Sequence, residues 1–193
     1  MVLRPTPSDW SAYTFQQAPL LALIDQLSNA GVRHIEIAWS AHPRWPELIS
    51  VLQDRYSDLY LGAASVIDAM ALDQVSQLGM AYAMSPCLDP LLVSRARNHG
   101  LVLVPGVFSP SEVHQAKTLG CELIKLFPAG SLGIAYRRQL SAPLGPLPHM
   151  IAAGGLTVAD LDPWLAAGYH AVALGRGVIA ADRLDHDLLK WLS

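Results

Sequence analysis

Residues 101–128 read LVLVPGVFSPSEVHQAKTLGCELIKLFP, and this stretch decides the fold class. It opens and closes on apolar runs of strand length. Between them, Ser109-Pro110-Ser111-Glu112 is a capping box with proline at the first helical position, which predicts the start of a helix. Gly120 stands where that helix gives way to the second strand, the usual place for a left-handed residue. The stretch therefore predicts strand, helix and strand in succession.

The same unit recurs outward in both directions. Further runs of strand length are HIEIAW (34–39), LYLGAAS (59–65), AYAMSP (81–86), MIAAGG (150–155) and AVALG (171–175). Strands that alternate with helices pair in parallel through right-handed crossovers, in either an open doubly wound sheet or a closed barrel. Because the strands are short and evenly spaced, and no G-x-G-x-x-G follows the first, a (β/α)8 TIM barrel is favoured.

The start of the chain is the irregular part of this pattern. Seven strands are clear, and only MVLR (1–4) has the character of an eighth. We therefore predict a barrel with a shortened or irregular first strand, in a single domain spanning 1–193. Residues 5–17 are expected to form an irregular connection on the surface.

Composition limits the functional classes. The chain has 52% hydrophobic residues, 15% charged residues and a net charge of −3, which does not indicate a nucleic-acid surface. No apolar stretch approaches the roughly 20 residues that span a bilayer, and no signal peptide is evident. We expect a cytoplasmic protein that binds neither nucleic acid nor membrane, with no cofactor.

The remaining polar residues do not suggest a metal site. The two cysteines, Cys87 and Cys121, are far apart, and the histidines lack metal-ligand spacing. Asp182, Asp185 and Asp187 are expected in a solvated C-terminal helix without a catalytic role.

Lys125 is the first candidate for chemistry. In ELIKLFP it alternates with Ile124 and Leu126, so it faces the barrel interior if those two face the helices. Burial lowers the pKa of a lysine and supplies the free amine that Schiff-base chemistry needs. The alternative is a lysine that faces outward, with its amine extended to solvent between helices.

Glu36 is the second candidate. In RHIEIAWS the bulky set Ile35, Ile37 and Trp39 suits the outer face, so Glu36 points inward. A buried carboxylate needs a partner, and Lys125 is the one we expect. Such a pair either carries acid–base chemistry or is purely structural.

Two glycine-rich loops late in the chain form the third candidate. Gly154 and Gly155 follow one strand, and Gly175-Arg176-Gly177 follows the next. In (β/α)8 barrels these loops commonly bind phosphate, since glycine lets backbone N–H groups approach an anion and arginine adds a bidentate contact. Glycines that only make tight turns are the alternative.

With these residues the chain resembles the 2-keto-3-deoxy-6-phosphogluconate / 4-hydroxy-2-oxoglutarate aldolase family. The resemblance runs from about Leu20 to Ile179. It rests most specifically on IKLFPAG (124–130) and GVRHIEIAWS (31–40), with support from MSPCLDPLLV (84–93) and AAGGLTVADLDPWLAAG (152–168). It implies a homotrimeric barrel that cleaves a 2-keto-4-hydroxy acid to pyruvate and an aldehyde.

The resemblance also implies roles for individual residues. Lys125 would form the Schiff base and Glu36 would shuttle protons. The substrate site would include Ser65, Pro86 and Phe127, with phosphate held by the residues Gly154, Gly155, Gly175, Arg176 and Gly177.

The departures from the family pattern fall at positions that are expected to bind the substrate. Many members have an arginine where Ser40 stands, and others have one at the end of the first strand, where Arg4 stands. The threonine before Gly-Gly is Ala153 here, and Gly177 replaces a phosphate-loop serine. Two other hypotheses therefore stay open: an oxaloacetate decarboxylase that uses the same imine, and a catalytically decayed barrel that acts as a binding subunit.

Overall fold

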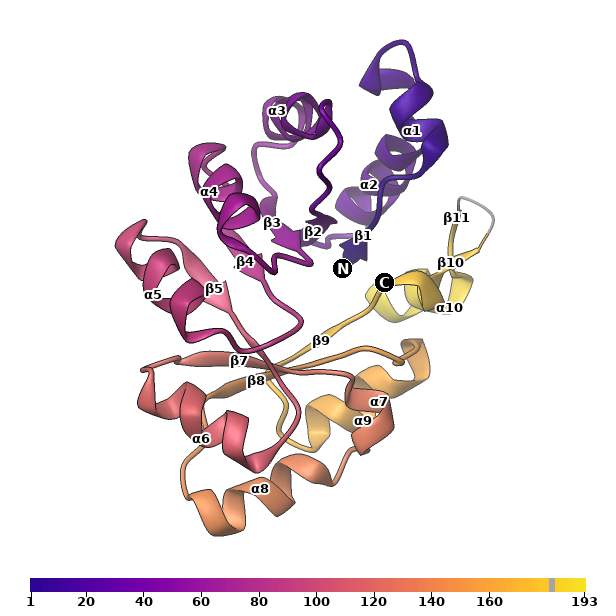
Figure 1. The fold of residues 1–193 in the computed structure, drawn as a ribbon. Coiled ribbons are helices and arrows are strands. Elements are labelled where there is room, and N and C mark those ends of the chain that lie inside the picture. The colour runs from indigo at the N-terminus through magenta and orange to yellow at the C-terminus, as the bar shows by residue number, and fades with distance from the viewer. Residues whose placement is uncertain (181–182) are drawn as a thin grey trace.

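A computed structural model describes residues 1–180 and 183–193. Parallel strands alternate with helices along this part of the chain, as the sequence predicts (Figure 1). The strands are β1 (Val2–Leu3), β2 (His34–Ala38), β3 (Tyr60–Ala64), β4 (Tyr82–Met84), β5 (Val102–Val104), β6 (Gly106–Val107), β7 (Leu123–Leu126), β8 (His149–Ala153), β9 (Ala171–Ala173), β10 (Ile179–Ala180) and β11 (Arg183–Leu184).

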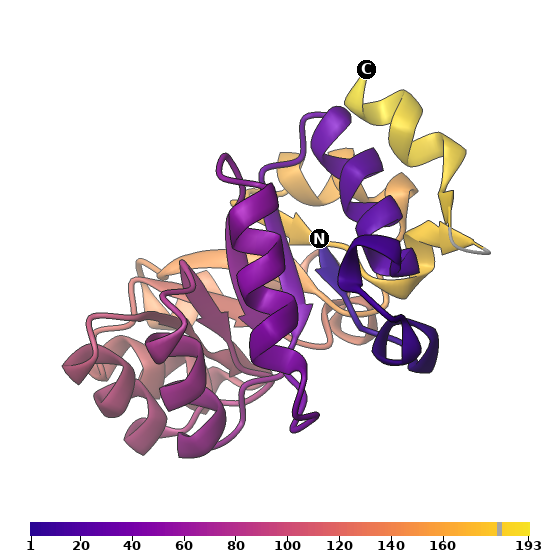
Figure 2. The same cartoon turned by 90° about the horizontal axis from the view of Figure 1, so that it is seen from above.

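The helices follow the strands on the outside (Figures 1 and 2). The α-helices are α1 (Pro7–Ser11), α2 (Pro19–Asn29), α3 (Trp45–Arg55), α4 (Ala69–Gln77), α5 (Pro90–Asn98), α6 (Pro110–Thr118), α7 (Ala129–Leu132), α8 (Tyr136–Leu144), α9 (Leu161–Ala166) and α10 (His186–Leu192). Three 3-10 turns complete the set: η1 (Phe15–Gln17), η2 (Val158–Asp160) and η3 (Arg176–Val178). None of the described helices is long and apolar enough to cross a membrane.

Apart from β10 and β11, which form an antiparallel pair, the described strands form two parallel sheets that are joined at both edges. One sheet has the order β1-β2-β3-β4-β5 and the other β6-β7-β8-β9. Strands β5 and β6 are one strand interrupted at Pro105, whose carbonyl accepts from the Lys125 N–H at 2.8 Å. At the other edge, the Val2 N–H donates to the Leu174 carbonyl at 2.8 Å. With β5 and β6 counted as one, eight strands of the described chain form the barrel, and the predicted fold class is confirmed.

The helix starts that the sequence predicts are also found. Asp89 caps α5 by accepting from the Leu91 N–H at 2.8 Å. At α6 the Glu112 carboxylate accepts from the Ser109 N–H at 2.7 Å, which closes the capping box. Gly120, before β7, has φ +72°, a conformation that costs glycine little.

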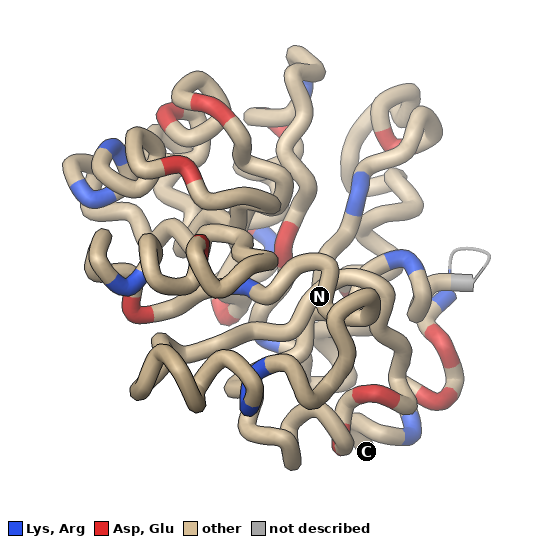
Figure 3. Tube along the Cα trace, turned by 60° about the horizontal axis from the view of Figure 1, so that its bottom comes forward, with Lys and Arg blue, Asp and Glu red and all other residues tan. Residues whose placement is uncertain are grey.

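Apolar packing lies on both faces of the strands. The larger core fills the space between strands and helices, where Ile35 and Ile37 of β2 are completely buried. A smaller cluster of Met84, Val104 and Ile151 lies inside the barrel, with Leu123 packed against it. Acidic and basic residues are interspersed along the outer helices (Figure 3). The interior cluster supports the layer of the barrel that contains Lys125.

The connection at residues 5–17 differs from the prediction. It contains α1 and η1, and its Phe15 side chain is buried. Asp9 is only 1% exposed and accepts from the N–H of Leu20 at 2.7 Å. The segment lies largely on the surface, as expected, but the expectation that it is irregular was wrong, because α1 and η1 order it and Asp9 links it to α2, distant in sequence.

The chain end is described from Arg183. Asp182 lies outside the described residues. Asp185 precedes α10 and caps it by accepting from the Asp187 N–H at 2.7 Å, so the helix begins one residue later, at His186.

Candidate active site

Lys125 projects into the barrel from β7. Its register partners are Gly106 on β6 and Ile151 on β8. The neighbouring residues Ile124 and Leu126 are completely buried on the outer face, so strand alternation directs Lys125 inward. The side chain is 7% exposed, and its Nζ lies 5.3 Å from the centre of the Phe127 ring. The amine thus lies near the C-terminal ends of the strands, which we call the barrel mouth.

Glu36 faces the same interior from β2. It is 4% exposed and pairs in register with Val2 and Gly62. A Cβ on Gly62 would overlap the Tyr82 ring, so the glycine leaves room for that ring inside the barrel. Glu36 and burial both raise the pKa of the Tyr82 hydroxyl, burial being the larger cause.

Burial shifts the pKa of both candidate side chains, Lys125 and Glu36. It lowers the pKa of Lys125, while Glu36 and Cys87 oppose this change. It raises the pKa of Glu36 against the opposing charges of the Met1 amino group and Lys125. Among the described residues no ion pair joins Lys125 to Glu36, so the direct pairing we expected is not found. A less basic amine and a more basic carboxylate suit proton transfer near neutral pH.

Arg4 reaches the mouth beside β3. It follows β1, and its guanidinium donates to the Ser65 Oγ at 3.2 Å. Ser65 has φ +62°, the left-handed region that non-glycine residues rarely adopt. Such strain is typical of functional positions. The structure therefore brings a cationic and a hydroxyl side chain together near the Glu36 end of the mouth.

The two glycine-rich loops also lie together. Gly154 has φ +90°, and its carbonyl accepts from the Gly130 N–H at 2.9 Å. A Cβ on Gly177 would lie 3.5 Å from the Leu156 carbonyl, which places the loop after β9 against the loop after β8. Gly155 and Arg176 are exposed there. Backbone N–H groups and a guanidinium are thus available to an anion.

Phe127 borders the Lys125 amine, and Pro86 lies against Gly106, the register partner of Lys125. A Cβ on Gly106 would overlap the Pro86 carbonyl, so the turn after β4 packs against the inner side of β6. The next residue, Cys87, is exposed. The sequence reasoning missed both Tyr82 and Cys87. Alternation in AYAMSP, which puts Tyr82 on the face of Met84, was the available signal for the first.

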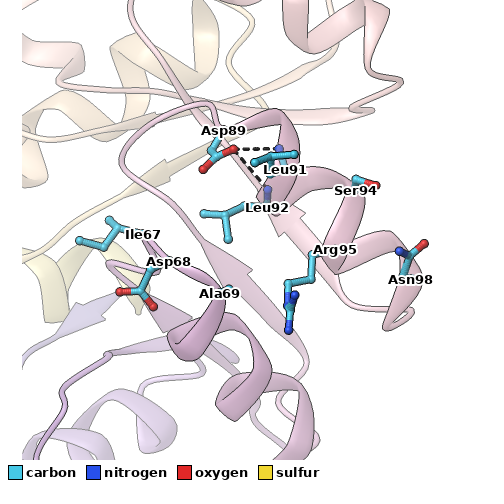
Figure 4. A pocket seen from close by; sticks show the side chains of 9 residues that line it. All are labelled: Ile67, Asp68, Ala69, Asp89, Leu91, Leu92, Ser94, Arg95 and Asn98. Atoms are coloured by element: carbon cyan, nitrogen blue, oxygen red, sulfur yellow. Dashed lines mark hydrogen bonds between the residues drawn. The ribbon is translucent and has the colours of Figure 1, made fainter.

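A separate pocket lies outside the barrel, between α4 and α5. Its volume is about 550 Å³, and its lining includes Ile67, Leu91 and Arg95 (Figure 4). Asp89 caps α5 at its edge. None of its lining residues is one of the candidate catalytic or binding residues, and the described chain contains no cluster of potential metal ligands.

The fold and site define a class of protein: a (β/α)8 barrel with a buried lysine and glutamate at its catalytic end. Comparison with known proteins gives the family. The family described as KDPG and KHG aldolase matches residues 14–191, and the chain belongs to it. It is therefore a lyase of the aldolase type.

Individual relatives are distant but extensive. The chain is 28% identical over 162 residues to 2-dehydro-3-deoxy-6-phosphogalactonate aldolase of Escherichia coli, covering 83% of this chain and 78% of that one. A cube-shaped protein cage designed by fusing symmetric oligomeric domains matches with TM-score 0.81 and 25% identity, covering 99% of this chain and 67% of that one. KDPG aldolase from Legionella pneumophila, with pyruvate captured as a covalent carbinolamine, matches with TM-score 0.78 and 22% identity, covering 94% and 84%.

Proposed function

We propose that the chain, acting as one barrel domain, is a class I aldolase that cleaves a 2-keto-4-hydroxy acid to pyruvate and an aldehyde through an imine on Lys125. The observation that carries the proposal is the buried Lys125 amine, whose pKa burial lowers, at the barrel mouth where (β/α)8 enzymes react. The carbinolamine named for the Legionella relative supports the same chemistry here.

The reaction begins when neutral Lys125 attacks the C2 ketone. Glu36 moves protons while the carbinolamine loses water, and then takes the proton of the C4 hydroxyl. The C3–C4 bond breaks because the protonated imine accepts its electrons, which leaves an enamine on Lys125. Protonation and hydrolysis release pyruvate. Acid–base help of this kind contributes about 10²–10⁴-fold to a rate.

Arg4 and Ser65 are proposed to bind the substrate carboxylate. The guanidinium matches a carboxylate in geometry, and the Ser65 hydroxyl already lies 3.2 Å from it. Ser40 stands where the family resemblance implies an arginine in many members, so Arg4 is the cation that we propose for the substrate carboxylate. Pro86 and Phe127 would pack against the pyruvyl part.

The other end of the substrate is proposed to contact the two glycine-rich loops. The Escherichia coli relative is named for a phosphorylated sugar acid. Phosphate would bind the backbone N–H groups of Gly154, Gly155, Gly175 and Gly177, with Arg176 as its cation. Since Ala153 offers no hydroxyl, backbone groups and Arg176 would carry most of that affinity.

Borohydride trapping tests the imine. Pyruvate and borohydride should leave one stable secondary amine per chain, which peptide mapping should locate on Lys125. Lys117 and Lys190 are the internal controls, since Lys117 is engaged with the Leu144 carbonyl and Lys190 lies on the exposed helix α10. Lys125→Ala should abolish trapping, and Glu36→Gln should slow turnover more than imine formation.

Turnover then identifies the bond that is cleaved. Phosphorylated and unphosphorylated 2-keto-4-hydroxy acids are compared with oxaloacetate, which would lose CO₂ through the same enamine. A wild-type chain left unmodified by pyruvate and borohydride would defeat the Schiff-base proposal.

The oligomer is proposed to be a homotrimer. Two apolar side chains that line the pocket of Figure 4, Ile67 and Leu91, are strongly exposed. Met70, which follows the lining residue Ala69 in α4, is strongly exposed as well. Apolar patches of this kind mark interfaces. The designed cage built from symmetric oligomeric domains supports association, because one of its chains shares this fold.

A further inference from the structure

Cys87 is held at the barrel mouth beside the Lys125 amine. Gly106 is the register partner of Lys125, so their inward faces are adjacent. The Pro86 carbonyl occupies the space that a Gly106 side chain would fill, which brings Cys87, the next residue, to the same side. The Ser85 Oγ accepts from the Cys87 N–H at 3.3 Å and lies 3.6 Å from its Sγ. Since Ser85 is buried, this turn is fixed.

The second observation at this part of the barrel mouth concerns the Lys125 amine. Its side chain is 93% buried, yet the described residues provide it with neither a hydrogen bond nor an ion pair, so the amine is aimed unpartnered into the barrel. Cys87 and Lys125 interact electrostatically, because a negative sulfur raises the pKa of the amine.

Cys121 provides an internal contrast. It precedes β7, at the end of the barrel opposite the mouth, and is only partly exposed. Burial raises the pKa of its thiol. A thiol that is less accessible and less ionised reacts slowly, so the two cysteines of the chain should differ strongly in reactivity.

We propose that Cys87 is a covalent modification site, at which a small disulfide attaches and blocks access to Lys125. The Cys87 thiol first loses its proton to water. The sulfur then attacks one sulfur of the disulfide, their new bond forms as the original S–S bond breaks, and the other half leaves as a thiolate with the electron pair. Cys87 is oxidised, the reagent is reduced, and an added thiol reverses the step. The loss of aldolase function rests on the proposed role of Lys125.

Glutathione disulfide is the probe, with Cys87→Ser and Cys121→Ser as matched variants. Mass mapping over time should show Cys87 reacting at least about tenfold faster than Cys121. In the wild type and in Cys121→Ser, treatment should reduce pyruvate–borohydride trapping on Lys125 several-fold, and dithiothreitol should restore it. Cys87→Ser should keep the trapping level of its own untreated sample. Pyruvate reduced onto Lys125 beforehand should slow the reaction of Cys87.

Two results would overturn the proposal. One is equal or faster reaction of Cys121 in the folded chain, and the other is full modification of Cys87 with undiminished trapping. If the untreated wild type does not trap pyruvate, the Schiff-base function has failed on its own. The ratio of thiol reaction rates, which needs no turnover, then decides whether Cys87 is the modification site.

Discussion

At the scale of single residues, burial without a side-chain hydrogen bond distinguishes Lys125 and Glu36 from the other charged side chains that the structure describes. Of the buried polar residues, Asp9 has backbone partners, whereas Lys125 has no hydrogen-bond partner among the described residues. The alternation of apolar residues in β7 and β2 was enough to predict that both side chains face inward. It could not predict that they stay apart, because strand pattern does not determine distances across a barrel.

Glu36→Gln should stabilise the protein while it impairs catalysis. Burial raises the Glu36 pKa above its ordinary value of 4.5, so the folded chain binds the proton more tightly than the unfolded chain. The stability that this provides is complete below pH 4.5 and is lost as pH rises through the raised pKa. At pH 8 the glutamine of the variant is neutral, so the variant does not pay the free-energy cost of a buried carboxylate that the wild type has. A gain of about 1 kcal/mol would raise Tm by roughly 2–4 °C.

Glu47→Gln is the control for that measurement. Glu47 is an exposed residue of α3 whose pKa its hydrogen bond with Arg44 lowers, so its removal should not stabilise. Thermal unfolding at pH 4 and pH 8 gives the comparison. A Tm for Glu36→Gln that equals the wild-type Tm at pH 8 would show that the carboxylate is not held in an unfavourable state.

Arg4 and Arg176 should contribute to the binding of different parts of the substrate. Arg176→Ala should weaken a phosphorylated substrate by about 1.5–3 kcal/mol, the value of a charged hydrogen bond, and leave an unphosphorylated one nearly unchanged. Arg4→Ala should raise KM for both, because every 2-keto acid carries the carboxylate. Steady-state kinetics with a matched substrate pair measures this, and equal effects of Arg176→Ala on both substrates would make that arginine structural.

At the scale of elements, local signals predicted most of the structure. Capping residues and glycines gave the starts and ends of α5 and α6 because those contacts lie within a few residues. The segment at 5–17 was missed because its order depends on Asp9 reaching Leu20 across 11 positions. Cys87 was missed because its position depends on β4, β5 and β6 meeting in space.

Asp9→Ala should destabilise that segment strongly. The carboxylate accepts from the Thr6 N–H and hydroxyl as well as from the Leu20 N–H, at 2.7 Å each, and its loss leaves the buried Leu20 N–H unpaired. We expect about 1–3 kcal/mol by urea unfolding. Asp160 makes the same two bonds to Thr157 without that burial, so Asp160→Ala should cost only about 0.5–1 kcal/mol. Equal losses would mean that the link to α2 contributes little.

At the scale of the whole molecule, the barrel class followed from the repeating strand–helix unit, but the oligomer did not. Exposure of apolar residues cannot be read from the sequence, since buried and exposed leucines look alike in it. Leu91, for example, is 80% exposed although it adjoins the buried Leu92. The surface that an oligomer covers therefore becomes visible only in the fold.

Sedimentation should give three times the chain mass at micromolar concentration. Leu91→Asp places a charge in the exposed apolar patch and should shift the mass towards the monomer, because an unpaired charge is costly at an interface. Tyr13→Asp is the control, since Tyr13 is 93% exposed on the separate segment at 5–17. A monomeric wild type would rule the trimer out.

The hydrogen bond from the Val2 N–H to the Leu174 carbonyl closes the barrel at a narrow seam between β1 and the end of β9. The flanking strand β1 has only two residues, and Gly175 lies against Val2 across the seam. Local opening of the barrel would begin at this seam, and it would separate Arg4 from the loop that contains Arg176. A substrate bound by both arginines would stabilise the closed seam. The rate of deuterium exchange at the Val2 amide should therefore fall when the active site is occupied.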